Sequence, residues 1–414
     1  MLKKILIATA VIILLASGIY YFFFYQSEPV PLTDEPSGIP NVVFNPISRS
    51  GAPASNQEVS SASTTEPQES LAPLKIPDLR QLSTTPIGGF MASTTASSTV
   101  ARYIDRGVGH VYEALSTENE IKRISNTTIQ KIYESYWNKN LDAMILRYIK
   151  EGTGAIVNFY AEIRPLKTST TTSEESLNEI KGKFLSADIR EIAVSPKGDR
   201  VFTLNKEGEG LVGYISGFDE SKKTKILTTP LLQLNADWPE ENTIVLTTKA
   251  SAGASGYLYF FDIKKSSLKK VLGKIPGFTA KTSSNTKKVI FSSGSNKVST
   301  SLYDTADNST QEVTFRTIAD KCVWSRINMN DIYCAVPTEI PAGVYPDDWY
   351  KGNISFVDQI WYLDAATGQV RILANLLGLS NSLIDAVDLT LDPKENFLYF
   401  VNKRDLTLWS LKLD

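Results

Sequence analysis

The chain of 414 residues is poor in histidine and cysteine and carries no excess charge of either sign. His110 is the only histidine, which excludes zinc sites built from several histidines and mechanisms that need a pair of them. Lysine and arginine total 43 against 45 acidic residues, so we expect no nucleic-acid partner. The chain also lacks a glycine-rich phosphate loop, a Gly-x-Ser-x-Gly elbow and an acidic calcium loop. The sequence therefore predicts neither a metal nor a cofactor.

Segments with a helical period are almost absent after residue 74. Short apolar runs separated by turn residues take their place, and aromatic residues make up 10% of the chain. This combination is typical of a strand-rich core, so the predicted fold class is all-β.

A long uncharged run lies near the N-terminus. Residues 5–27 exceed the roughly 20 residues that cross a bilayer, and Lys3 and Lys4 precede them. The positive-inside rule then places residues 1–4 in the cytoplasm and the rest outside, in the periplasm or at the cell surface. We predict a single-pass signal-anchor helix in the cytoplasmic membrane. A cleaved signal peptide is the alternative, because Ala16-Ser17-Gly18 resembles a cleavage site.

Residues 28–74 are a mixture of proline, serine and threonine without helical or strand period. Such a segment cannot bury enough apolar surface to offset the entropy of ordering. It is therefore predicted to be a disordered linker that holds a domain of residues 75–414 away from the membrane.

A hairpin unit recurs along residues 75–414. In its clearest copy, a strand ends at Val194, a tight turn runs over residues 195–199, and a new strand opens at Val201. Similar turns precede Val111, Met144, Ile244, Val289, Ile332 and Leu398. The mean interval between these copies is about 48 residues, which is typical of propeller blades, and residues 75–414 divide into seven such units.

The two ends of this domain complement each other. Residues 408–414 match the third strand of a blade, and residues 78–82 have the pattern of the fourth strand that is missing there. Pairing them would remove the exposed sheet edges of an open ring. We therefore predict a seven-bladed β-propeller closed by an N-terminal strand.

The turn Ser195-Pro196-Lys197-Gly198-Asp199 and the strands that end in Asp262 and Asp364 resemble those of TolB-like, WD-repeat-like propellers. Propellers of this kind also occur as the non-catalytic domain of prolyl oligopeptidases. The resemblance covers roughly residues 78–414 and implies the fold. TolB-like proteins carry an α/β domain where this chain has a linker, and the oligopeptidases add a hydrolase domain, so the resemblance implies a propeller without a catalytic domain.

A catalytic site in a propeller of this composition would need carboxylates that converge in the central channel. Asp105, Asp188, Asp237 and Asp388 lie near predicted first strands, which line such a channel, but loop solvation also accounts for each of them. We expect a non-enzyme, namely a membrane-tethered extracytoplasmic protein-binding or scaffold module. A glycan-binding propeller, and a hydrolase or lyase that uses channel carboxylates, are the alternatives.

An insertion at residues 337–356 separates the second and third strands of the sixth blade. Loops of this kind often carry binding residues on repeat scaffolds. The predicted partner-binding residues are Tyr345, Asp347, Asp348, Trp349, Tyr350 and Lys351. The aromatic rings would bind a protein or peptide at the cell envelope, or stack on a glycan, and the charged residues would form the rim. Alternatively, the loop folds its aromatic residues back over its own blade.

Cys322 and Cys334 are the only cysteines, and each lies six residues from Asn328, the centre of a predicted hairpin turn. A symmetric antiparallel register puts them opposite each other, within disulfide reach. Because the domain is predicted to face an oxidising compartment, we predict a disulfide. Two buried free thiols are the alternative.

Overall fold

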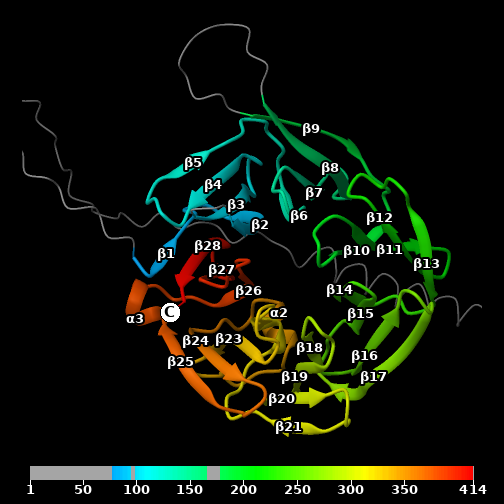
Figure 1. Ribbon diagram of the computed structural model, residues 1–414, viewed down its shortest axis with the longest axis vertical. Helices are drawn as coiled ribbons and strands as arrows, with labels where there is room; N and C mark the ends of the chain where they lie inside the picture. The colour runs from blue at the N-terminus through cyan, green and yellow to red at the C-terminus, as the bar shows by residue number, and fades with distance from the viewer. Residues whose placement is uncertain (1–76, 95–97, 166–177, 414) are drawn as a thin grey trace, which may run out of the picture. The chain divides into compact units, whose positions relative to one another are not determined.

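The computed structural model describes residues 77–94, 98–165 and 178–413. They form seven antiparallel sheets of four strands around a central axis (Figure 1). In each of blades 1 to 6, which are given below, the strand that comes first in the chain lies nearest the axis and the fourth strand lies at the outer edge. The predicted all-β fold with seven blades is confirmed for this part of the chain.

The first four blades follow one another directly. Blade 1 contains β2 (Ile87–Thr94), β3 (Thr99–Asp105), β4 (Val111–Leu115) and β5 (Ile121–Arg123), and blade 2 contains β6 (Ile132–Trp137), β7 (Ala143–Ile149), β8 (Ile156–Pro165) and β9 (Asn178–Phe184). Blade 3 contains β10 (Ile189–Val194), β11 (Val201–Glu207), β12 (Gly210–Ser216) and β13 (Thr224–Thr229), and blade 4 contains β14 (Leu234–Glu240), β15 (Thr243–Thr248), β16 (Ser255–Asp262) and β17 (Ser267–Pro276).

The last three blades carry the short helices. Blade 5 contains β18 (Thr279–Thr282), β19 (Lys288–Gly294), β20 (Val298–Asp304) and β21 (Thr310–Glu312), and the 3-10 turn η1 (Ala319–Lys321) leads into the next blade. Blade 6 contains β22 (Cys322–Trp324), β23 (Asp331–Pro337), β24 (Asp358–Asp364) and β25 (Val370–Asn375), with α2 (Asp347–Tyr350) between β23 and β24 and α3 (Leu376–Ser380) after β25. Blade 7 contains β26 (Ala386–Leu391), β27 (Phe397–Asn402), β28 (Thr407–Lys412) and β1 (Leu79–Gln81).

Blade 7 joins the two ends of the domain. β1 pairs antiparallel with β28, with Leu79 opposite Leu411 and Gln81 opposite Trp409. The Leu82 amide extends this pairing by donating to the Leu408 carbonyl at 2.7 Å. The predicted closure of the ring by an N-terminal strand is confirmed.

Six of the seven predicted hairpin turns lead into the second strand of a blade, as expected, but the first does not. Val111 opens β4, which is the third strand of blade 1. The second strand is β3, so the first repeat was assigned one strand too late. The best-formed turn, between β10 and β11, is held by Ser195, whose hydroxyl bonds the Asp199 carboxylate at 2.8 Å.

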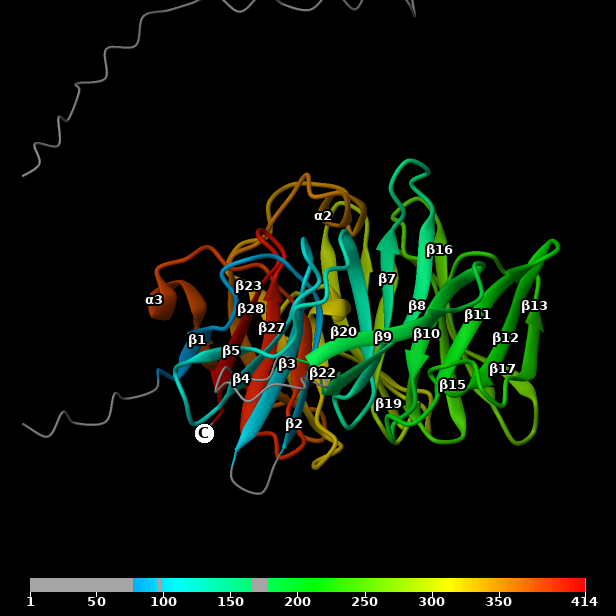
Figure 2. The ribbon, with the colours of Figure 1, turned by 90° about the horizontal axis from the view of Figure 1, so that it is seen from above.

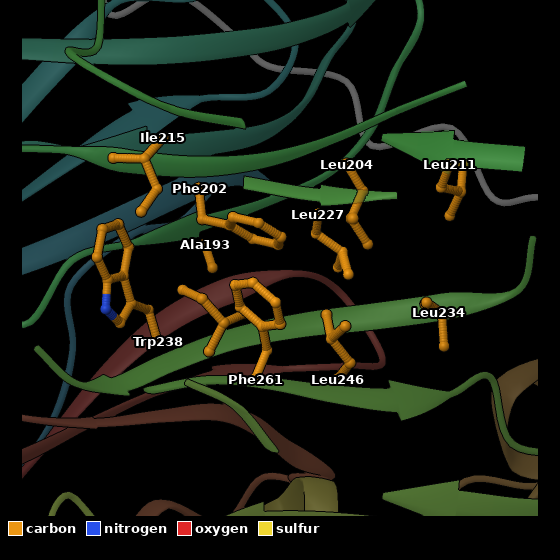
Figure 3. Packing of buried hydrophobic residues seen from close by; sticks show 11 residues of the cluster. Ala193, Phe202, Leu204, Leu211, Ile215, Leu227, Leu234, Trp238, Leu246 and Phe261 are labelled. Atoms are coloured by element: carbon orange, nitrogen blue, oxygen red, sulfur yellow. The ribbon is translucent and has the colours of Figure 1, made fainter. Parts of the chain in front are cut away.

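The apolar core lies between neighbouring blades. Figure 3 shows side chains of blade 3, including Phe202, facing Trp238 and Phe261 of blade 4. All three are fully buried, and burying one such aromatic side chain stabilises the fold by about 1.5–3 kcal/mol. Trp137 and Trp324 are also buried and end inner strands as Trp238 nearly does, so this repeated tryptophan position serves packing between blades.

The propeller belongs to a compact unit that spans Ala72–Asp414. No helix within the part of the chain described by the structure is long and apolar enough to span a membrane. The predicted anchor at 5–27 and the predicted linker at 28–74 lie outside the described residues.

Candidate functional site

A polar cavity of about 380 Å³ lies where the inner strands of several blades meet. Its wall includes Tyr136 of β6, Asn235 of β14 and Thr247 of β15, and Tyr350 reaches it from the insertion in blade 6. The charged residues of the wall are Glu191, Asp237, Lys281, Asp320 and Asp388. They come from β10, β14, β18, η1 and β26 respectively, so five segments far apart in the sequence each contribute one charge.

Irregular strand pairing accompanies three of these residues. The register shifts beside Glu191 in β10, after Asp237 in β14 and around Asp388 in β26. Such bulges re-aim side chains and are frequent next to functional sites. Asp388 also has a φ of 54°, in the left-handed region that few residues other than glycine adopt. This conformation costs free energy, and local strain of this kind concentrates at functional sites.

Three of the cavity carboxylates have partners in the protein. Glu191 lies 2.8 Å from the Lys249 ammonium, Asp237 accepts the Trp238 amide at 2.7 Å, and Asp320 accepts the Tyr350 hydroxyl. The Glu191 charge is therefore neutralised, whereas those of Asp237 and Asp320 are not.

Lys281 and Asp388 differ from these residues. Within the described ranges, neither side-chain charge has a hydrogen bond or an ion pair. Desolvation opposes the charged form of Lys281, but Asp237, Asp320 and Asp388 outweigh it and raise the pKa of Lys281. Desolvation raises the pKa of Asp388, and Lys281 offsets only part of that effect. Thr282 is a further unsatisfied group, because it lines the cavity, is buried and has an unpartnered hydroxyl.

The insertion between β23 and β24 is fastened to three other blades. The Tyr345 amide donates to the Ser295 carbonyl of blade 5 at 2.7 Å, and Asp347 accepts the Ala252 amide of blade 4 at 2.6 Å. On the side of blade 7, Arg404 donates to the Phe356 carbonyl at 3.2 Å. Figure 2 shows α2, within this insertion, at one edge of the ring of sheets. The insertion is therefore fixed to the ring, and its Tyr350 lines the cavity.

Two glycines let the insertion approach blade 5 closely: Gly277, which precedes β18, and Gly294, which ends β19. A Cβ on Gly294 would lie 2.5 Å from the Tyr345 carbonyl oxygen, and one on Gly277 would lie 2.7 Å from it. Gly277 also has a φ of +59°, which a larger residue would adopt only under strain. A side chain at either position would displace the insertion.

A buried ion triad lies under the insertion. The Lys321 ammonium contacts Asp358 at 2.8 Å and also contacts Asp385, and all three side chains are fully buried. Asp385 also accepts the Trp349 indole N–H at 3.0 Å and the Phe356 amide at 2.9 Å. Burial alone would raise the pKa of Asp385, but Lys321 and these donors outweigh it and lower that pKa. The triad thus joins η1, blade 6, blade 7 and the insertion.

Asp358 is the member of this triad whose hydrogen bonding is incomplete. Its Oδ2 accepts from Lys321 and from the Ala386 amide, whereas Oδ1 has no partner among the described residues. Burial, together with the charge of Asp385, raises the pKa of Asp358 to about 6 despite the presence of Lys321. Keeping this group ionised above pH 6 therefore destabilises the folded protein.

We predict that Asp358→Asn changes how stability depends on pH. Between about pH 4 and pH 6, folded Asp358 holds a proton that the unfolded chain releases, so stability falls as the pH rises through this window. The variant has no carboxyl group here and so does not lose this stability. Its free energy of unfolding relative to that of the wild type should therefore rise by about 2–3 kcal/mol between pH 4 and pH 8. Urea unfolding at both pH values measures the difference. An equal gap at pH 4 and pH 8 would show that Asp358 does not titrate as described.

Two of the predicted partner-binding residues are buried, which corrects part of the predicted surface. Tyr345 and Trp349 are 1% and 3% exposed, because they pack with Phe356 beneath the insertion and beside Lys321. They are not available to a partner, and the alternative of an inward-folding loop holds for both. Asp347 is bound to blade 4, as described above, and Asp348 accepts the Val344 amide at 2.7 Å within the insertion. Tyr350, which is 42% exposed, and Lys351 remain accessible.

The four candidate channel aspartates do not converge. Asp237 and Asp388 line the cavity, as the channel hypothesis requires. Asp105 is buried at the end of β3, where it accepts the Thr85 hydroxyl at 2.6 Å, and Asp188 is exposed before β10. Within the described ranges, no group of three or more His, Cys, Asp or Glu side chains could hold a metal ion. Sequence reasoning missed Lys281, Asp320 and the triad, since none of them lies in a recognisable motif.

Cys322 and Cys334 lie opposite each other in the β22–β23 ladder and form a disulfide, with their Cα atoms 4.1 Å apart. We predict that alkylation of the intact protein without reductant adds no label, because both sulfurs are bonded. Replacing both cysteines with serine should lower the free energy of unfolding by about 2–4 kcal/mol. Intact-mass analysis checks the first expectation, and two added labels would contradict it.

The described residues thus form a seven-bladed β-propeller with a polar cavity of about 380 Å³ among its inner strands. The chain matches no known family model and no curated protein. Among solved structures it is similar to an oligogalacturonate lyase in complex with manganese, with 9% identity, 82% of this chain and 99% of that chain covered, and a TM-score of 0.48. It is also similar to TolB from Acinetobacter baumannii, with 14% identity, coverage of 78% and 79%, and a TM-score of 0.41. A third similar structure is a puromycin-hydrolyzing peptidase from Mycobacterium tuberculosis, with 10% identity, coverage of 77% and 52%, and a TM-score of 0.46.

These comparisons correct one expectation. Most of the similar structures are enzymes, including lyases and peptidases, so the expectation of a non-enzyme is not kept. At identities of 7–14% the similarity shows a shared fold and does not establish a shared activity. Function must therefore be inferred from the cavity itself.

Proposed function

We propose that this chain is a membrane-tethered, extracytoplasmic propeller that binds a protein or peptide partner by taking a basic side chain into its central cavity. The main support for this proposal is the charge of the cavity wall. Among the described residues, Lys281 is the only cation of the cavity wall, and it faces Asp237, Asp320 and Asp388, which leaves an excess of negative charge there. A cationic group of the ligand would balance that excess.

The size of the cavity suits a single side chain or a similarly small group. Its volume of about 380 Å³ is near the lower end of the range for ligand sites, which is about 300–1,000 Å³. Tyr350 stands at the boundary between the cavity and the outer surface of the insertion. Desolvation and Asp320 raise the pKa of Tyr350 well above its ordinary value, so its hydroxyl stays protonated. Tyr350 and Lys351 would contact the remainder of the partner at the rim.

A short peptide with one lysine and blocked ends tests this proposal. Isothermal titration at low salt should detect binding, and acetylation of the lysine should weaken it at least about tenfold, because the charged donor is lost. Binding should also weaken as salt rises. Equal affinity for the acetylated peptide would rule out recognition of the charge.

The tether is proposed from the uncharged run at residues 5–27. Protease added to spheroplasts should digest the propeller while leaving cytoplasmic proteins intact. Complete protection, or a released mature form that begins near Ile19, would contradict an exported and anchored domain.

Acid–base catalysis is the second candidate function, and the raised pKa of Asp388 favours it. A carboxyl group with a raised pKa can donate a proton, and a second carboxylate such as Asp237 could accept one, as in a hydrolase or lyase. Turnover of oligosaccharide or peptide substrates that is lost in both Asp388→Asn and Asp237→Asn would support this function. Under that outcome, the lysine peptide need not bind.

A further inference from the structure

An exposed apolar segment projects from the rim of blade 6. Four apolar side chains within a stretch of twelve residues are between 40% and 57% exposed, namely Ile372, Leu377, Leu379 and Leu383. We call these four residues the α3 patch. Clustered exposed apolar side chains mark interaction surfaces more often than scattered ones do.

The α3 patch is held in place by the ring. Leu376 of α3 is fully buried in the core shared by blades 6 and 7. The helix is capped by Asn375, whose side chain accepts the Gly378 amide, and Ser380 donates to the Leu376 carbonyl at 2.7 Å. The exposed leucines are therefore presented by a fixed element and are not an unanchored loop.

The segment that carries the α3 patch holds a single charge, which is positive. Residues 365–384 contain no aspartate or glutamate, and Arg371 is the only charged side chain among them. Arg371 is exposed at the start of β25. An apolar surface with a basic neighbour complements the interface of a bilayer that contains anionic lipid.

The α3 patch also lies where the N-terminal part of the chain enters the ring. α3 contacts β1, and Leu79 of β1 packs against the same core as Leu376. Figures 1 and 2 both show α3 beside β1. The 76 residues before the described region include the uncharged run at 5–27, so the predicted anchor connects to the propeller on this side of blade 7.

We propose that the α3 patch docks on the surface of the membrane that anchors the chain. Three leucines bind a bilayer weakly by themselves, but a flexible linker of residues 28–74 would have a root-mean-square reach of only about 40 Å. Docking then becomes an intramolecular step at a high effective concentration. This contact would fix the orientation of the ring relative to the membrane, with blades 6 and 7 nearest to it.

The test uses the full chain in vesicles of phosphatidylcholine and phosphatidylglycerol that carry a lipid-attached nitroxide. A fluorophore is placed on Leu379→Cys and, as a matched control, on Leu268→Cys, an exposed leucine of blade 4. We expect quenching at position 379 to be at least about twofold, with almost none at position 268. Adding Leu377→Ser and Leu383→Ser should abolish quenching at 379, whereas Leu232→Ser should not.

Equal quenching at the two positions, or its persistence in the serine variants, would overturn the proposal. So would a dimer in detergent that is lost in the same serine variants, because the α3 patch would then contact a second copy of the chain. Thermal unfolding of each labelled variant confirms that the ring is intact.

Discussion

Replacing Trp349 with alanine should lower the free energy of unfolding by about 3–5 kcal/mol, the usual cost of removing a buried aromatic side chain. Trp349 stacks on Phe356, and its indole N–H donates to the buried carboxylate of Asp385. Its removal leaves a cavity beside the Lys321 triad and takes one donor from Asp385. Guanidinium unfolding followed by circular dichroism measures the loss.

The neighbouring Tyr350 provides the matched control. Tyr350→Phe removes only the hydroxyl that bonds Asp320, on a residue that is partly exposed, so its cost should stay below about 1 kcal/mol. The same variant should weaken binding of the lysine peptide, because Tyr350 lines the cavity. If Trp349→Ala unfolds at the wild-type midpoint, the insertion is not seated on the ring as described.

Deleting residues 75–82 should have a comparable or larger effect on stability. The deletion removes β1, exposes the edge of β28 and uncovers apolar surface around Leu411, with an expected loss of about 3–6 kcal/mol. It also removes the Leu82 carbonyl that accepts the buried Tyr103 hydroxyl at 2.9 Å. Chemical unfolding of the deletion variant measures the loss, and sedimentation should reveal self-association through the free strand edge.

A deletion of residues 66–70, upstream of β1, is the control for chain shortening. It should leave both the midpoint and the monomeric state unchanged. A deletion of 75–82 that behaves like this control would contradict closure of the ring by β1.

The blades could be predicted from the sequence because each hairpin repeats local turn chemistry. The one misplaced repeat has a local cause. The second strand of blade 1, β3, follows a run of serine, threonine and alanine at residues 93–98 that contains no glycine, proline, asparagine or aspartate. The next turn contains Gly107 and Gly109, so it gave the stronger signal although it precedes the third strand.

The candidate site was harder to predict, since its parts are distant in the sequence. Asp237, Lys281 and Asp388 meet only because the ring closes, and register shifts around two of them disturb the alternation that would reveal which side chains face the axis. Tyr345 and Trp349 have the composition of an interface, but the same large amphipathic rings also suit a buried core. Trp349 is directed inward by its contacts with Lys321 and Asp385, and Tyr345 by its stacking on Phe356.

The most direct test of the proposed function is the affinity for the single-lysine peptide in two variants that change the charge of the cavity in opposite directions. Lys281→Met removes the one cation that lines the cavity among the described residues and should tighten binding at pH 8 by about tenfold, whereas Asp388→Asn should weaken it by a similar factor. Isothermal titration of both variants against the wild type, with folding checked by circular dichroism, gives these values. Weaker binding by Lys281→Met together with unchanged binding by Asp388→Asn would contradict recognition of a basic group in the central cavity.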